Sequence, residues 1–301
     1  MIDFIKIHYR DKRSFEPFIL NEQHFEYVEK TVEYHTGEIK YPYRTRYESM
    51  DYGVSEKTGY IKNSLHKFHN VIKNNGDHNY NNFTYSNLCD SIDLLLKKMV
   101  EPESTTITQL EFGLNIRTSI PAEEIIRKNI LMHNYKGANH NRKYYGKGEL
   151  KQFDYHNYFI KIYDKAKQYK KEFRLKQNIL RFELKFTKAV EFHKVGIFNI
   201  FDLKDKAKLR SLFILLLKRF DELTIIDDID NMNLMNSQDM NNYNKYLNSR
   251  FWESLSEENK RQTKSRYKKD FERIQEEFSL NQTKQSLRNL LTQKFIYLIN
   301  N

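Results

Sequence analysis

The chain is poor in cysteine. It has one, Cys89, in 301 residues, which excludes an intramolecular disulfide framework and any cysteine-rich metal site. Cys89 falls in an apolar pattern of helical spacing, so we expect it to be a buried packing residue. Long apolar runs are absent too, and the longest, such as residues 212–217, are far too short to cross a bilayer. The first residues indicate a strand followed by charges rather than a signal peptide. We therefore expect a soluble, intracellular protein without a membrane partner.

Acidic residues are outnumbered by basic ones. The chain has 40 Asp and Glu against 51 Lys and Arg, a net charge of +11, and its isoelectric point is about 9.3. A basic surface of this size suits a polyanion, most simply nucleic acid. A second interpretation stays open, because the abundance of Lys, Asn, Ile, Tyr and Phe is also what A·T-rich coding favours. The 39% hydrophobic and 14% aromatic content predicts a packed core rather than a disordered chain.

Several motifs of common enzymes are missing. The chain has 9 glycines but no glycine-rich phosphate loop and no nucleophile elbow, and it has neither an HExxH nor a CxxC motif. Nucleotide hydrolysis and zinc chemistry are therefore disfavoured. No internal repeat is evident in the sequence.

Patterns of period two predict strands in the first part of the chain. The strands are expected at residues 2–9, in a hairpin within 26–50 that turns at Thr36–Gly37, and at 59–66, 110–116, 160–165 and 179–186. Helices are expected at 83–99, capped by Ser86, and from Pro121 to about His133. We interpret 133–148 as a basic loop and 165–176 as a basic connector. Helical spacing then returns at 203–223 and over 240–301, so a mixed α+β region, residues 1–188, precedes a mainly helical region, residues 189–301.

Two acidic residues fall on the polar sides of predicted strands. In residues 179–186 the apolar side chains alternate with Arg181, Glu183 and Lys185, and in residues 110–116 Glu111 lies on the side opposite the leucines. If these strands pair in one sheet, two carboxylates share its polar face. Converging carboxylates repel each other, and a divalent cation resolves that conflict. Carboxylate oxygens suit Mg²⁺ or Mn²⁺. The alternative is that both acids simply lie on a solvated sheet face.

Tyr163 lies at the end of a predicted strand, close to Lys165 and on the same face as Lys161. A phenol titrates near pH 10, so attack by its oxygen at neutral pH needs a base, a cation or a metal. Either lysine could supply the cation and could also neutralise charge on a phosphate. The alternative is that Tyr163 packs at the edge of the sheet.

Further candidates lie outside these strands. His66 and His69 are expected at a strand end, where a spacing of three points them to opposite faces, so contact with phosphate by His66 or Lys67 is the simpler interpretation. The basic stretch 264–273 predicts either a solvated helix face or a grip on DNA backbone, and it carries Tyr267, a second candidate nucleophile. Tyr144 and Tyr145 could stack on the bases of a single strand.

The order of five short pieces resembles a known family. The pieces are Met1-Ile2-Asp3, IKNSLHK at 61–67, TTITQLEFGLN at 105–115, FIKIYDK at 159–165 and NILRFELKF at 178–186. This order is similar to that in the replication initiators of filamentous phages, the gene II type, and in the related plasmid initiators and relaxases. The similarity covers roughly residues 1–200. It implies an antiparallel sheet with helices on one face, as in the nuclease domains of those proteins.

The resemblance also implies a reaction. Tyr163 would nick one strand of origin DNA, form a 5′-phosphotyrosyl link, leave a 3′-hydroxyl primer and later rejoin the ends. Glu111 and Glu183 would hold Mg²⁺ or Mn²⁺, with Lys165 and Arg181 in the same pocket. The expected partners are origin duplex, melted single strand, a host helicase and a second copy of the chain, in the cytoplasm of a bacterium or a phage-infected host. The residues expected to contact DNA are Lys62, Ser64, His66, Lys67, Tyr144, Tyr145, Arg181 and Lys185.

A rival hypothesis fits the same residues. The chain could be a nucleic-acid-binding regulator without catalytic activity. In that case Glu111 and Glu183 would form ordinary cross-strand ion pairs with Arg181 or Lys185.

Overall fold

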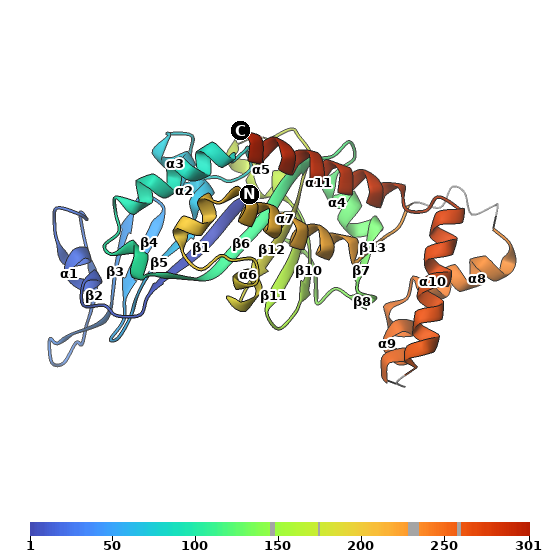
Figure 1. Ribbon diagram of the computed structural model, residues 1–301, viewed down its shortest axis with the longest axis horizontal. Coiled ribbons are helices and arrows are strands. Elements are labelled where there is room, and N and C mark those ends of the chain that lie inside the picture. Colours follow the sequence, from blue (N-terminus) through green and yellow to red (C-terminus); the bar gives the residue numbers. More distant parts are fainter. Residues whose placement is uncertain (145–147, 174, 228–234, 258–259) are drawn as a thin grey trace.

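The computed structural model describes residues 1–144, 148–173, 175–227, 235–257 and 260–301. Its centre is a sheet of ten strands in the order β2-β3-β4-β5-β1-β6-β12-β11-β10-β9, and every neighbouring pair is antiparallel (Figure 1). In that order the strands are Glu29–Val32, Ile39–Tyr47, Met50–Val54, Gly59–Ser64, Ile2–Tyr9, Thr106–Arg117, Ile179–Phe186, Tyr158–Asp164, Gly148–Asp154 and His140–Tyr144. A second sheet joins β13 (Leu223–Ile225), β7 (Ile130–His133) and β8 (Lys136–Gly137).

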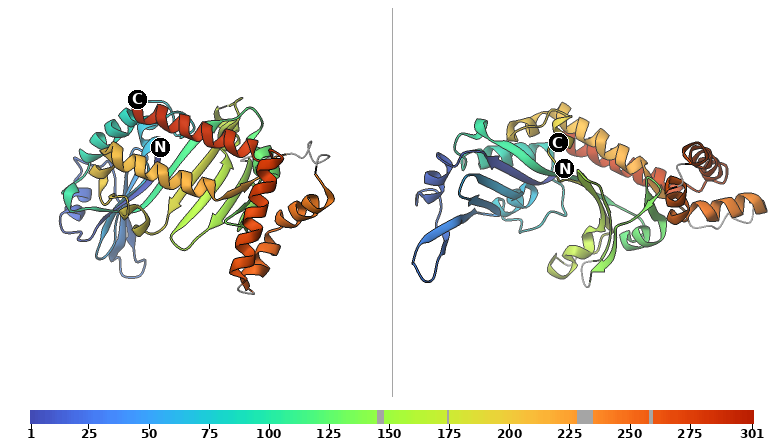
Figure 2. Two further views of the ribbon diagram at one scale, coloured as in Figure 1. Left: turned by 45° about the vertical axis from the view of Figure 1, so that its right-hand side comes forward. Right: turned by 90° about the horizontal axis from the view of Figure 1, so that it is seen from below.

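Helices cover one face of the large sheet (Figure 2). The covering helices are α2 (Leu65–Ile72), α3 (Tyr85–Leu96), α7 (Lys206–Asp221) and α11 (Gln282–Asn300). The alternating apolar residues of the central strands pack under them: the rings of Phe112 and Phe295 lie 6.4 Å apart, and those of Phe182 and Phe220 lie 5.5 Å apart. The expected α+β fold, with an antiparallel sheet, helices on one face and a helical C-terminal region, is confirmed.

The remaining helical segments are shorter or lie at the ends of the sheet. They are α1 (Phe15–Leu20), η1 (Pro102–Ser104), α4 (Ala122–Glu124), η2 (Ile125–Asn129), α5 (Lys165–Phe173), α6 (Val190–His193), η3 (Ile200–Lys204), α8 (Ser237–Tyr246), α9 (Ser249–Glu257) and α10 (Arg261–Glu277). None of the helices in the described ranges is both long enough and apolar enough to cross a membrane.

Two hydrophobic cores divide the C-terminal half. Leu212 of α7 and Leu291 of α11 belong to the main core beneath the sheet. Trp252, Tyr243 and Phe271, from α9, α8 and α10, form a second core together with Met132 of β7. Helices α8–α10 therefore make a separate small unit, which Figure 1 shows beyond the end of the sheet. The division of the chain at residue 188 stays a prediction.

Some local predictions were wrong. The strand at 59–66 ends at Ser64, whose side chain accepts a hydrogen bond from the backbone of Lys67 and caps α2, so His66 lies on a helix. Thr84 rather than Ser86 caps α3. The helix after Pro121 ends at residue 129, the segment 133–148 includes β8 and β9, and the connector at 165–176 includes α5.

Strand β10 had not been predicted at all. Its polar residues explain the failure, because Glu149 and Lys151 occupy buried positions on the same side as Phe153. The ammonium of Lys151 donates to the backbone carbonyl of Ile130, which satisfies a charge in a place where an alternating pattern would have an apolar side chain.

Candidate metal and phosphoryl-transfer site

Strand register brings the two predicted acids together. Glu111 pairs with Lys185, and Glu183 pairs with Gly113 on one side and Lys161 on the other. Glu111 and Glu183 therefore lie on one face of adjacent strands, as the alternation predicts. Gly113 leaves the room for this arrangement, since a Cβ there would lie 2.9 Å from the Cβ of Glu183.

A third acid, Asp3, completes the cluster. One carboxylate oxygen from each of Asp3, Glu111 and Glu183 lies within 4.8 Å of the others. The register of β1 on β6 shifts between Ile2 and Ile5, and both isoleucines are fully buried. This bulge interrupts the alternation and turns Asp3 toward the polar face. Asp3 was not among the predicted site residues, although an acid within a short apolar strand is visible in the sequence.

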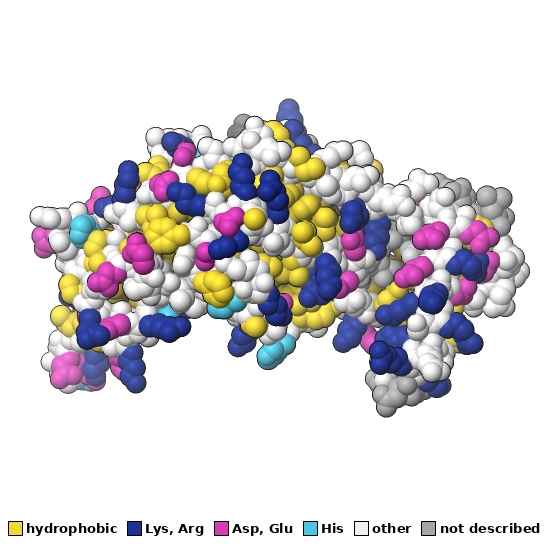
Figure 3. Space-filling view, viewed as in Figure 1, with side chains coloured by type: hydrophobic (Ala, Val, Ile, Leu, Met, Phe, Trp, Pro, Cys, Tyr) yellow, Lys and Arg dark blue, Asp and Glu magenta, His cyan; other side chains and the backbone are white. Residues whose placement is uncertain are grey.

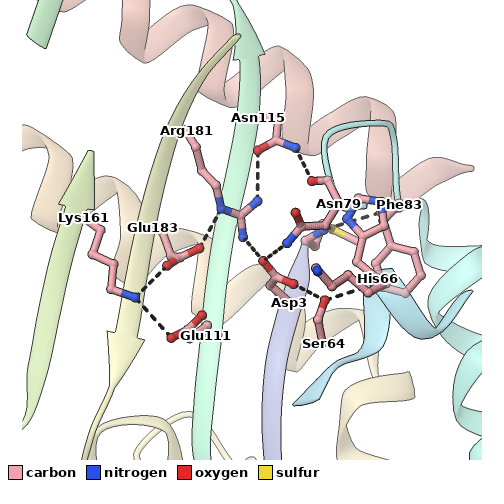
Figure 4. Close-up of polar contacts among 12 residues, drawn as sticks. Asp3, Ser64, His66, Asn79, Phe83, Glu111, Asn115, Lys161, Arg181 and Glu183 are labelled. Carbon is pink, nitrogen blue, oxygen red and sulfur yellow. Dashed lines mark hydrogen bonds and ion pairs between the residues drawn. The ribbon is translucent and has the colours of Figure 1, made fainter. Parts of the chain in front are cut away.

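Three cations bind these carboxylates, and Figure 4 shows two of them, Arg181 and Lys161. Arg181 donates from Nη2 to Asp3 at 2.9 Å and from Nε to Glu183 at 2.6 Å. The ammonium of Lys161 lies 3.3 Å from an oxygen of Glu111 and 3.3 Å from an oxygen of Glu183. Lys185 contacts Glu111 at 3.1 Å. We call Asp3, Arg181 and Glu183 the buried end of the acid cluster, and Glu111, Lys161 and Lys185 its open end.

The two ends differ in exposure to water. At the buried end the side chains are 2–7% exposed, whereas at the open end they are 12–32% exposed. The alternative interpretation, that both acids lie on a solvated sheet face, does not hold for Glu183, which is buried. Its cover is built from α5 and the segment 73–84: Asn79 donates to Asp3 at 2.6 Å, and the hydroxyl of Tyr169 donates to Asn79 at 2.7 Å.

The cations decide which carboxylates are held ionised. Burial by itself raises the pKa of Asp3 and of Glu183, but the surrounding cations and hydrogen bonds, Arg181 foremost, together outweigh it and hold both below their ordinary values. The pKa of Glu111 is raised instead, first by burial and then by the charge of Glu183. The cluster therefore has two strongly ionised members and one that binds a proton more readily.

The candidate nucleophile lies beside this cluster. The hydroxyl of Tyr163 donates to Glu183 at 3.4 Å, and the ammonium of Lys165 lies 5.3 Å from the centre of its ring. Burial, followed by the charge of Glu183, raises the pKa of Tyr163 well above its ordinary value. Burial and the nearby Arg181 lower the pKa of Lys165 to about 7. Tyr163, Lys161 and Lys165 thus meet the acids in one place.

A divalent cation fits the donor set. Asp3, Glu111 and Glu183 offer hard oxygen ligands from three neighbouring strands, which is the chemistry that Mg²⁺ and Mn²⁺ prefer. Such an ion would compete with Lys161, which contacts two of the three acids.

Some of the other predicted residues contact these acids, and others do not. Ser64 donates to Asp3, and Arg181, besides its two acids, donates to Asn115 at 3.0 Å. His66 and His69 share one face of α2, contrary to the strand interpretation, and His66 stacks on the ring of Phe83 with centroids 4.8 Å apart.

The predicted DNA contacts outside the cluster also have defined places. Lys67 pairs with Asp77 at 3.1 Å, and Lys62 lies on β5 with its ammonium 5.2 Å from the ring of Tyr60. Tyr144 ends β9, and Tyr145 lies outside the described residues. Tyr267 lies on α10 and packs against the second core.

Comparison with known proteins finds similarity to solved structures alone. No family model matches the chain, and no curated protein matches it. The chain is similar to the rolling circle replication initiator protein from Geobacillus stearothermophilus, with 12% sequence identity and a TM-score of 0.42, over 77% of this chain and 89% of the other.

Proposed function

We propose that this chain is a metal-dependent DNA nickase and rejoining enzyme that initiates rolling-circle replication of a phage or plasmid. One observation carries the proposal: the Tyr163 hydroxyl contacts Glu183, a member of a cluster of three carboxylates. A nucleophile next to a metal-binding set of acids is the arrangement that phosphoryl transfer through a covalent intermediate needs. The order of the sequence motifs gives the proposal its substrate class, origin DNA.

In the reaction, the phenolic oxygen of Tyr163 attacks the scissile phosphorus. The bond between that oxygen and phosphorus forms, and the bond from phosphorus to the 3′ oxygen breaks. The phenolic proton leaves along the hydrogen bond to Glu183, and the 3′ oxygen takes up a proton to become the primer hydroxyl. The phosphotyrosyl bond conserves the energy of the broken phosphodiester, so that the reverse reaction rejoins the strand without ATP.

The charged residues have different tasks in this mechanism. Lys161 and Lys185, which reach solvent, neutralise the phosphate as charge builds on its oxygens. Arg181 is bound by Asp3, Glu183 and Asn115 and orients the acids. A divalent ion held by the three acids would polarise the phosphate as a Lewis acid.

Helices α8–α10 would hold duplex DNA. Lys and Arg side chains gather on the lower part of this unit (Figure 3). Lys245 lies 4.8 Å from the ring of Tyr267, and Lys268 lies 4.4 Å from the ring of Tyr135. Cations on such a face increase the affinity for DNA, and this contribution decreases as the salt concentration rises.

The decisive experiment looks for the covalent adduct. Supercoiled DNA that contains the coding sequence of this chain and its flanks is incubated with the protein and Mg²⁺ or Mn²⁺, and protein attached to a 5′ end is detected after denaturation. We expect Tyr163→Phe to abolish the adduct and to leave DNA binding within about twofold, because one hydroxyl is lost and the ring remains. Tyr267→Phe is the matched control and should form the adduct normally. An adduct that persists in Tyr163→Phe would refute the assignment of the nucleophile.

The rival function, a binding protein without catalysis, also has support. Both of its expected ion pairs are present, Lys185 with Glu111 and Arg181 with Glu183, so the acids are neutralised without a metal. Titration with Mn²⁺ separates the two functions. The nickase should bind Mn²⁺ through the cluster and lose at least tenfold in affinity in Asp3→Asn, whereas the rival requires no binding that depends on Asp3.

A further inference from the structure

The polar sheet face continues beyond the acid cluster toward β5 and β3. Lys6 of β1 pairs with Gln109, two residues from Glu111 on the same side of β6. On its other side Lys6 pairs with Lys62, and two residues along β5 is Tyr60. Phe4 connects this row to the cluster, because the ammonium of Lys185 lies 5.7 Å from the centre of its ring.

Tyr60 lies flat across a neighbouring glycine. Gly53 of β4 is its partner in the sheet, and a Cβ on Gly53 would lie 2.4 Å from the Cζ of the Tyr60 ring. The ammonium groups of Lys6 and Lys62 lie 5.3 and 5.2 Å from the centre of the same ring. Within the described part of the chain, neither lysine forms an ion pair with a carboxylate. The result is an aromatic platform between two cations that lack acidic partners.

A cavity of about 450 Å³ opens beside this platform. Tyr60, Lys62, Arg44 and Arg46 line it, together with Asp51, which pairs with Arg46 at 2.8 Å. Its volume falls in the range of small-ligand sites, about 300–1,000 Å³. Seen from below, this part of the sheet lies between the β2–β3 hairpin and α5, on the side away from α7 and α11 (Figure 2).

We infer that this row, Phe4, Lys6, Tyr60 and Lys62, is a track for single-stranded DNA that leads into the acid cluster, with one base stacked on the ring of Tyr60. The inference rests on the proposed function, because it names the form of DNA that reaches the cluster. Lysines without acidic partners suit phosphates, and a flat ring stacks on any base. Together they recognise a strand whose bases are unpaired, since the bases of a duplex are already stacked on each other.

The test measures binding of fluorescein-labelled (dT)20 by anisotropy, in EDTA and in a Tyr163→Phe background so that no cleavage occurs. We expect Tyr60→Ala to weaken binding by about 5- to 150-fold, the range for loss of one stacked base, and Tyr60→Phe to bind nearly as the parent. Tyr34→Ala is the matched control, because Tyr34 is 94% exposed and lies in the turn of the β2–β3 hairpin.

An abasic 20-mer separates stacking from charge. On this probe Tyr60→Ala and its parent should bind equally, because there is no base to stack. The double variant Lys6→Ala, Lys62→Ala should lower the slope of log affinity against log salt by about 0.7 for each lysine. Arg210→Ala, on α7, should not change that slope.

Three results would overturn the inference: unchanged (dT)20 affinity in Tyr60→Ala, equal losses on both probes, or an unchanged salt slope in the lysine variant. Should Tyr60→Ala fail to fold by circular dichroism, the salt slope of the lysine variant decides. These failures leave the Tyr163 adduct untouched. Conversely, if the nickase proposal is wrong, an adduct forms without Tyr163 while the binding of (dT)20 stays normal.

Discussion

The buried and open ends of the acid cluster hold the same kinds of charge in different surroundings. At the buried end Arg181 is 3% exposed and Asp3 is 7% exposed, whereas at the open end Lys185 is 32% exposed. Buried charges depend on each other, because water cannot replace a lost partner. Exposed charges can exchange partners with water, an ion or a phosphate at little cost. The buried end therefore sets the geometry, and the open end is where substrate can enter.

The largest expected effect is the loss of the buried guanidinium. Arg181→Met leaves Asp3 and Glu183 without their shared cation, and we expect the free energy of unfolding to fall by about 3–5 kcal/mol. Urea denaturation at pH 7 measures this. A fall below about 1 kcal/mol would mean that water reaches these acids and that the two ends are alike.

A buried titratable group outside the cluster gives a second measure of the cost of burial. His133 is fully buried and contacts Tyr155 and Glu222; burial lowers its pKa to about 4 from an ordinary value of 6.5. Between these values the unfolded chain binds a proton that the folded chain does not, so stability is present above pH 6.5 and is lost as the pH falls toward 4. The loss is at most about 3–4 kcal/mol, from 1.36 kcal/mol per pH unit over the interval between the two pKa values.

Urea denaturation between pH 7 and pH 4.5 tests this, with His133→Gln as the comparison. The variant should lose less stability than the parent over this range, because it lacks the proton-binding group. Equal losses in the two proteins would show that His133 does not govern the acid sensitivity.

The sequence predicted the acids on the regularly alternating strands better than the acid on the bulged strand. Glu111 and Glu183 could be predicted because β6 and β12 alternate regularly and their apolar faces are unmistakable. Asp3 could not be predicted, because the bulge in β1 arises from its pairing with β6. Such a bulge is not visible in the alternation of apolar and polar residues in the sequence. Likewise, the environment of Glu183 depends on Asn79 and Tyr169, which approach from distant parts of the chain.

Local capping and buried charge account for the other differences. His66 was placed on a strand, but Ser64 begins a helix there through its bond to the backbone of Lys67. Strand β10 was missed because Lys151 is buried and bonded to a carbonyl of another segment. In each case a polar group is satisfied by a partner that the local pattern does not contain.

A smaller effect is expected where the two ends meet. Gly113→Ala places a Cβ 2.9 Å from the Cβ of Glu183 and 2.9 Å from the carbonyl oxygen of Phe182. Because backbone has to move, we expect a loss of about 1–3 kcal/mol in the free energy of unfolding, with slower adduct formation as Glu183 shifts against Tyr163. Gly137→Ala is the control, since its nearest neighbour is a serine side chain at 3.3 Å. If Gly113→Ala is as stable as that control, the spacing of the acids does not depend on this glycine.

The smallest effect on stability is expected at the open end. Lys185→Met removes the cation that contacts Glu111 at 3.1 Å, but both groups reach water, so the free energy of unfolding should change by less than about 1 kcal/mol. The same substitution removes a positive charge next to the proposed path of the DNA, so the salt slope for (dT)20 should fall by about 0.7. Arg181→Met introduces the same side chain at the buried end, where we expect a large loss in the free energy of unfolding instead. Similar stability losses in the two variants would contradict the division of the cluster into two ends.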